Sequence, residues 1–161
     1  GVTSLDQLVA WKSLTVSQAE YLREAVRSGQ NMLIAGATHS GKTTLLCALL
    51  NELHQDTRLV SCEETFEIRA DLADWVAMQT RQPNLEGIGE VSLRRLIKEA
   101  LRMRPSRLVV GEVRAEDRCL KNCLTLGIRL RVGRESYRES RVRHDFFFLE
   151  QSENALGNFG G

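Results

Sequence analysis

Short apolar runs alternate along the chain with longer stretches in which apolar residues recur every three or four positions. Each run is too short for a helix and is bounded by polar or turn-forming residues, which is typical of a buried strand. The predicted strands lie at residues 32–35, 59–62, 75–78 and 108–110. The pattern therefore predicts an α/β domain in which a mostly parallel sheet is flanked by helices.

Capping residues set the limits of the predicted helices. Thr15 is a favourable N-cap, and the helix that follows it ends at Gly29. A second helix follows a glycine-containing turn and carries the leucines of residues 45–53. A third begins at Ser92, has its apolar residues on one face, and ends before Pro105.

The regular pattern stops near residue 114. We therefore divide the chain into residues 1–114, the predicted core, and residues 115–161, an atypical tail that is expected to be disordered, divergent or the product of a frameshift. The tail contains an arginine cluster: Arg129, Arg131, Arg134, Arg138, Arg141 and Arg143. Basic clusters can bind anionic lipid, but this one lacks the apolar face of an interfacial helix, which favours a solvated segment.

Composition narrows the choice of function. The 161 residues carry a formal net charge of +1, which weighs against a dedicated nucleic-acid binder. The sequence contains no apolar stretch long enough to span a membrane. Four cysteines are too few for a disulfide scaffold, and they do not have the sequence spacing that is typical of zinc ligands. Of these, Cys47 and Cys62 are expected to be buried, whereas Cys119 and Cys123 lie in the tail. Without a signal segment, a reducing, cytoplasmic location is expected.

The clearest chemical signal is a glycine-rich loop between the first predicted strand and the second predicted helix. It matches the phosphate-binding pattern G-x-x-x-x-G-K-[ST]. Its residues are Gly36, Ala37, Thr38, His39, Ser40, Gly41, Lys42 and Thr43, followed by Thr44. Glycines let successive backbone N–H groups face phosphate oxygens, and the helix adds its positive end. We expect Lys42 to reach the β- and γ-phosphates of ATP, Thr43 to ligate Mg²⁺, and His39 to point outward.

Acidic residues follow two of the predicted strands. Glu112 ends the fourth strand, and Glu63 and Glu64 end the second, with Glu67 three residues further. Because the carboxyl ends of parallel strands meet at one edge of a sheet, these acids are expected beside the phosphate loop. There a carboxylate could hold Mg²⁺ or orient an attacking water, with Glu112 as the better candidate. Each could instead be a solvated acid at a strand end.

The sequence resembles the secretion ATPase superfamily of type II and type IV secretion and tight-adherence pilus assembly. Residues 13–26, 36–46, 59–68 and 81–114 carry the resemblance. It implies a RecA-like P-loop NTPase core, incomplete at its C-terminal end, that binds ATP and Mg²⁺. It also implies a homo-oligomer in the form of a hexameric ring. The implied partners are secretion or pilus platform proteins of the inner membrane, and no specific nucleic acid. The implied location of the chain is cytoplasmic, peripheral at the inner membrane.

The resemblance also suggests roles for individual residues. The phosphate loop matches the family's Walker A motif. The family's acidic "Asp box" matches Glu63, Glu64 and Glu67. Its Walker B glutamate matches Glu112, which the resemblance implies to be both a catalytic group and a metal ligand. The positions of Arg81 and Arg114 match arginines that contact phosphate or bridge subunits.

The resemblance ends after Arg114. The family continues with a strand and a "His box" of the type T-x-H-A-N, whereas the later histidine of this chain, His144, fits no such box. Without the strands that follow, the run 108–110 is expected at or near an exposed edge of the sheet. Two functions stay open: an ATPase motor core, or a truncated nucleotide-binding module that cannot hydrolyse ATP. A nucleic-acid motor is disfavoured by the near-neutral charge.

Overall fold

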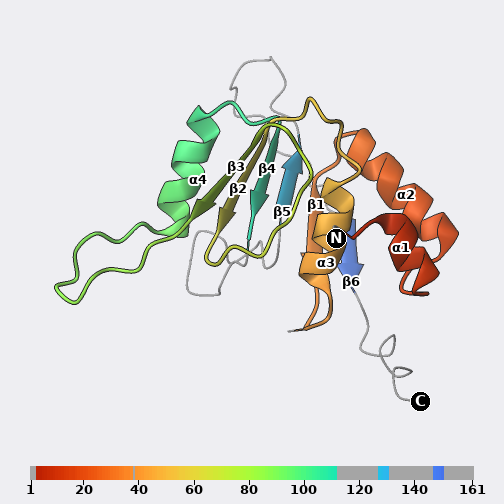
Figure 1. Cartoon of the computed structure of the whole chain (residues 1–161), viewed down its shortest axis with the longest axis horizontal. Helices are drawn as coiled ribbons and strands as arrows, with labels where there is room; N and C mark the ends of the chain where they lie inside the picture. Colours follow the sequence, from red (N-terminus) through yellow and green to blue (C-terminus); the bar gives the residue numbers. More distant parts are fainter. Residues whose placement is uncertain (1–2, 38, 112–126, 131–146, 151–161) are drawn as a thin grey trace.

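The computed structural model describes residues 3–37, 39–111, 127–130 and 147–150 (Figure 1). Its helices are α1 (Leu5–Ala10), α2 (Val16–Arg27), α3 (Lys42–Leu50) and α4 (Leu93–Arg102). Its strands are β1 (Met32–Ala35), β2 (Leu59–Glu63), β3 (Trp75–Gln79), β4 (Arg107–Val110), β5 (Gly127–Leu130) and β6 (Phe147–Glu150). All the strands and helices that the sequence predicts are present, and the fold is a mixed α/β fold.

The strands form one sheet in the order β3-β2-β4-β5-β1-β6. The strands β3, β2 and β4 pair in parallel, as do β1 and β6, whereas β5 is antiparallel to both β4 and β1. Five of the described strands therefore run in one direction, and their carboxyl ends meet at one edge. The expectation that residues 108–110 lie at an exposed edge is wrong, because β4 lies between β2 and β5.

The core is divided between the two faces of the sheet, because side chains alternate along each strand. One cluster packs α1, α2 and α3 against one face and includes Leu59 and Val109. The other packs α4 against the opposite face and includes Val60 and Leu108 (Figure 1). The helices thus flank the sheet on both sides, as the sequence predicts.

Local signals explain where the helices begin, but less well where they end. Thr15 caps α2, since its hydroxyl accepts a hydrogen bond from the Gln18 N–H at 3.2 Å while the Thr15 N–H donates to Gln18 Oε1 at 2.8 Å. The helix α3 ends at Leu50, earlier than expected, and Leu53 is buried in the turn that follows. The pattern missed α1, which at six residues is too short to show a helical repeat.

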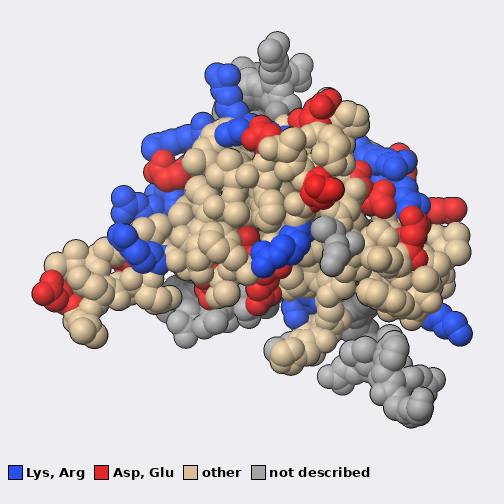
Figure 2. Space-filling model, in the orientation of Figure 1, with Lys and Arg blue, Asp and Glu red and all other residues tan. Residues whose placement is uncertain are grey.

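Charged side chains of both signs are interspersed over the face of the molecule shown in Figure 2. Some of them link elements: Arg23 on α2 donates to Asp6 on α1 at 2.9 Å and to Glu52 after α3 at 3.0 Å. These hydrogen bonds, the one to Glu52 first, raise the pKa of the Arg23 guanidinium. Among the described residues, no helix has the length and apolar character of a membrane span.

Candidate functional site

The phosphate loop lies between the carboxyl end of β1 and the first turn of α3. Gly41 precedes α3 with a φ of 85°, in the left-handed region that favours glycine. A Cβ on Gly36 would lie 2.5 Å from Ser40 Oγ, so that glycine leaves room for the loop to curl. The Ser40 hydroxyl oxygen is buried and has no hydrogen-bond partner among the described residues. Each glycine therefore has a structural reason: Gly41 allows the left-handed turn into α3, and Gly36 leaves room for Ser40. Thr38 lies outside the described residues.

The last two residues of the phosphate-binding pattern, Lys42 and Thr43, lie in the first turn of α3. Lys42 Nζ donates a 2.6 Å hydrogen bond to the carbonyl oxygen of Ala37, so the ammonium folds back over the loop. Thr43 Oγ1 donates to Glu67 Oε2 at 3.1 Å. His39 is exposed, as expected, with a φ of 64°.

The Thr43–Glu67 contact tests whether the residues present fit a magnesium ion. It brings together a hydroxyl and a carboxylate, both hard oxygen donors of the kind that Mg²⁺ prefers. No group of three or more His, Cys, Asp and Glu side chains that could hold a metal occurs among the described residues. A site with few protein ligands suits Mg²⁺, which usually keeps several waters and binds phosphate oxygens at the same time. The donor set therefore fits the ion.

Glu63 differs from the other acids because it is buried, with 2% of its surface exposed. Its Oε2 accepts hydrogen bonds from the N–H groups of Glu67 at 2.8 Å and Ile68 at 2.9 Å. Its Oε1 accepts from the hydroxyl of Ser61 at 3.1 Å, and that hydroxyl oxygen accepts from Trp75 Nε1 at 3.1 Å. Both carboxylate oxygens of Glu63 thus contact the protein itself.

Sequence reasoning did not select Ser61 or Trp75 for the site. A serine inside an apolar run, followed two positions later by an acid on the same face of the strand, is the signal that could have found them. Glu64, the second member of the acidic pair, lies half-buried after β2, and its carbonyl accepts from Gln79 Nε2 at 3.0 Å.

The remaining expected site residues lie further along the chain. Arg81 is exposed, and its Nε donates to the Gly89 carbonyl at 2.6 Å, while its backbone pairs with that of Val91. It closes the base of the loop at residues 82–90, which projects from the body at the left of Figure 1. Glu112 and Arg114 lie outside the described residues.

Gly111, the residue before Glu112, lies close to the start of the acidic loop, the name we give to residues 63–68. The N–H of Gly111 donates to the Cys62 carbonyl at 2.7 Å. A Cβ on Gly111 would lie 3.3 Å from both that oxygen and Glu63 Cα. The end of β4 therefore packs against the backbone at the end of β2, and the absence of a side chain permits this contact.

Two cysteines near the site are buried, as expected. Burial raises the pKa of the Cys47 thiol, whose Sγ accepts from the Arg69 N–H at 3.3 Å. Burial likewise raises the pKa of Cys62 to about 11. Both are thiols rather than thiolates at neutral pH, and they behave as small apolar side chains. Cys119 and Cys123 lie outside the described residues.

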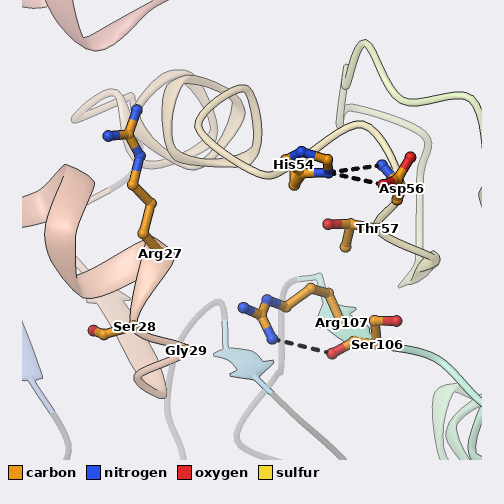
Figure 3. Close-up of a pocket in the computed structure, with 8 residues that line it drawn as sticks. All are labelled: Arg27, Ser28, Gly29, His54, Asp56, Thr57, Ser106 and Arg107. Carbon is orange, nitrogen blue, oxygen red and sulfur yellow. Dashed lines mark hydrogen bonds and ion pairs between the residues drawn. The ribbon is translucent and has the colours of Figure 1, made fainter.

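A separate pocket of about 420 Å³ lies at the opposite edge of the sheet. Gly29, Thr57 and Ser106, which line it, precede β1, β2 and β4, so it lies at the amino ends of these strands. Figure 3 shows His54 paired with Asp56 on one side, at 3.2 Å, and the Arg107 guanidinium on the other. This pocket is distinct from the phosphate loop.

Comparison with known proteins decides the family. The sequence model of the family described as Type II/IV secretion system protein matches residues 3–120. The chain belongs to this family. The match begins before α1 and covers the phosphate loop, the acidic loop and β4.

Individual members of the Type II/IV secretion family give the same result. The chain is 40% identical to the conjugal transfer protein TrbB of Rhizobium radiobacter, over 68% of this chain and 33% of that protein. It is 38% identical to the type IV secretion system protein VirB11 of Bartonella henselae, over 58% of this chain and 26% of that protein. The chain thus spans about a third or less of the length of these relatives.

A solved structure shares the fold. The VirB11 ATPase of the Brucella suis type IV secretion system, crystallised in complex with sulphate, matches with a TM-score of 0.54 and 31% identity. The match covers 68% of this chain and 31% of the VirB11 chain. The mixed α/β fold described above is therefore similar to that of this VirB11 ATPase.

Proposed function

We propose that residues 36–44 bind ATP with Mg²⁺, and that the chain is the motor core of a bacterial secretion or pilus-assembly ATPase. Such a core couples ATP hydrolysis to protein export or pilus assembly. One observation carries the proposal: Lys42 and Thr43 open α3 directly after a glycine loop, with the Glu67 carboxylate 3.1 Å from the Thr43 hydroxyl. Family membership and the likeness to an ATPase solved with sulphate support it.

Each side chain has a distinct part in this proposal. Lys42 exchanges the Ala37 carbonyl for β- and γ-phosphate oxygens, while the N–H groups of the loop and of the start of α3 donate to the phosphates. Magnesium, when bound, neutralises charge on the phosphates. Thr43 and Glu67 would hold it, and Glu112 would serve as a further ligand or orient the attacking water. Arg81 and Arg114 would contact phosphate or bridge subunits.

The proposal extends to assembly. We expect the protein to act as a homo-oligomeric ring, with six subunits as the family suggests, and to work on the cytoplasmic side of the inner membrane with platform proteins. The family match supports this part of the proposal. Interspersed surface charge and a net charge of +1 favour protein partners over a nucleic acid.

Calorimetry with ATP and Mg²⁺ tests the binding site. Lys42→Ala removes the ammonium from the phosphate loop, so we expect it to weaken binding strongly. Lys98→Ala, at an exposed position of α4, is the matched control and should bind like the parent chain. Equal affinity of the Lys42→Ala variant and the parent would overturn the assignment.

The second candidate function is nucleotide binding without hydrolysis. Residues 121–161 lie beyond the family match and contain no His box of the family's type, which favours this candidate. Positioned groups around the γ-phosphate supply most of the rate in phosphoryl transfer. Phosphate release should therefore be compared between this chain and one with a family-like ending joined after Arg114. A much higher rate in the second chain supports the candidate, and equal rates contradict it.

A further inference from the structure

A chain of hydrogen bonds connects β3 to the phosphate loop. It begins at the indole of Trp75, passes through the hydroxyl of Ser61 to the carboxylate of Glu63, and continues from there to the N–H groups of Glu67 and Ile68. The Glu67 side chain then accepts from Thr43 on α3. We call Trp75, Ser61 and Glu63 the buried relay.

The register of the sheet explains why these side chains meet. Trp75 on β3 pairs with Leu59 on β2, so their side chains lie on the same face of the sheet. Ser61 lies two positions after Leu59 along β2 and therefore shares that face. Glu63, a further two positions on, shares it as well. Leu59 on this face belongs to the same core cluster as the leucines of α3. Both Ser61 and Glu63 are inaccessible to solvent or nearly so.

The direction of each hydrogen bond is fixed by chemistry. An indole N–H can only donate, so the Ser61 oxygen accepts from Trp75 and its hydrogen is directed to Glu63. Backbone N–H groups can also only donate, so Glu63 accepts at both oxygens. A glutamine at this position would have one acceptor oxygen where the structure needs two, and would leave a buried polar group without its partner.

We propose that the buried relay is a positioning device: it holds the loop at residues 64–68 so that Glu67 faces Thr43 at the metal site. Glu63 then contacts the protein and neither the nucleotide nor the metal, in contrast to its expected role beside the attacking water. The part of this inference that concerns metal rests on the proposed function. The part that concerns the loop rests on the described contacts alone.

Trp75→Phe tests the relay in the full chain, because it removes the indole N–H and keeps an aromatic ring. The matched control is Trp11→Phe, since Trp11 is 54% exposed and lies at the end of α1. The first measurement is amide hydrogen exchange at Glu67 and Ile68. We expect these two amides to exchange about three- to tenfold faster in Trp75→Phe and in Ser61→Ala, and at the parent rate in the control.

The second measurement separates positioning from a general loss of packing. Binding of an ATP analogue that cannot be hydrolysed is followed with and without Mg²⁺. We expect Trp75→Phe and Ser61→Ala to require several-fold more Mg²⁺ for half-maximal tight binding, with the metal-free affinity unchanged. An equal loss of affinity with and without Mg²⁺ would indicate a merely structural role and overturn the inference.

The outcomes also distinguish this inference from the proposed function. Unchanged exchange at Glu67 and Ile68 in both variants would overturn the relay, whatever the nucleotide data show. Faster exchange in a chain that binds no nucleotide would support the relay as a device that orders the loop, and would overturn the proposed function together with the metal role.

Discussion

The hydroxyl of Thr43 donates a 3.1 Å hydrogen bond to the carboxylate of Glu67, which joins the first turn of α3 to the loop after β2. The two residues belong to different sequence motifs. Their contact couples the phosphate loop directly to the acidic loop. A change in either residue should therefore affect the chemistry of the other.

This coupling leads to a prediction for Glu67→Gln. The glutamine oxygen can still accept from Thr43, so the loop should keep its shape, but the negative charge that attracts Mg²⁺ is lost. We expect the Mg²⁺ concentration for half-maximal ATP binding to rise about tenfold or more. A magnesium titration followed by calorimetry measures this. Glu90→Gln, at an exposed position, is the control, and an equal shift in both variants would contradict the prediction.

For Glu112→Gln we expect retained nucleotide binding and slower turnover. The amide has the shape of the acid but can neither accept a proton nor provide a full negative charge. In a chain that hydrolyses ATP, phosphate release should fall by about 10²-fold or more. An unchanged rate would remove Glu112 from the mechanism.

Gly111→Ala should destabilise the fold. The added Cβ would lie 3.3 Å from the Cys62 carbonyl oxygen and from Glu63 Cα, both on the backbone, so the end of β4 must move away from β2. We expect the free energy of unfolding to fall by about 1–3 kcal/mol, measured by urea denaturation. A variant as stable as the parent would show that β4 adjusts easily at this point.

The loop at residues 82–90 should tolerate loss of its apolar side chains. Leu85 and Ile88 are 108% and 64% exposed, so serine at both positions should change the free energy of unfolding by less than about 0.5 kcal/mol. Asn84→Ala should act differently, because Asn84 Oδ1 accepts from the N–H groups of Glu86 and Ile88. We expect faster hydrogen exchange at these two amides, and a normal rate would contradict this account of the loop.

Stability should also decrease in alkaline solution. The pKa of the Cys62 thiol is about 11 in the folded chain, against an ordinary value of 9.0. Between these values the unfolded chain has already released a proton that the folded chain retains, so unfolding becomes easier as the pH rises from 9 towards 11. Cys62→Ala should show a shallower decrease than the parent in urea denaturation across this range, whereas equal slopes would exclude Cys62 as a cause.

The sequence was sufficient to predict the elements that depend on local signals. The Thr15–Gln18 capping box, the apolar run of β2 and the glycine loop before Lys42 all act through near neighbours along the chain. The role of Glu63 could not be predicted, because it depends on Ser61 and on an indole in another strand. The interior position of β4 could not be predicted either, because it depends on its neighbour β5. This strand has four residues, one of them an arginine, so its sequence shows no apolar run that would indicate a strand.

The internal hydrogen bonds of residues 82–90 have a consequence for association. Arg81 closes the base of this loop on Gly89, and Asn84 fixes its tip, so the backbone is ordered while Leu85 remains outside. A macromolecule that contacted Leu85 would not have to order the loop, and little conformational entropy would be lost on binding. Encounter at this loop would then resemble the docking of two rigid bodies, with an association rate that is not limited by folding of the segment.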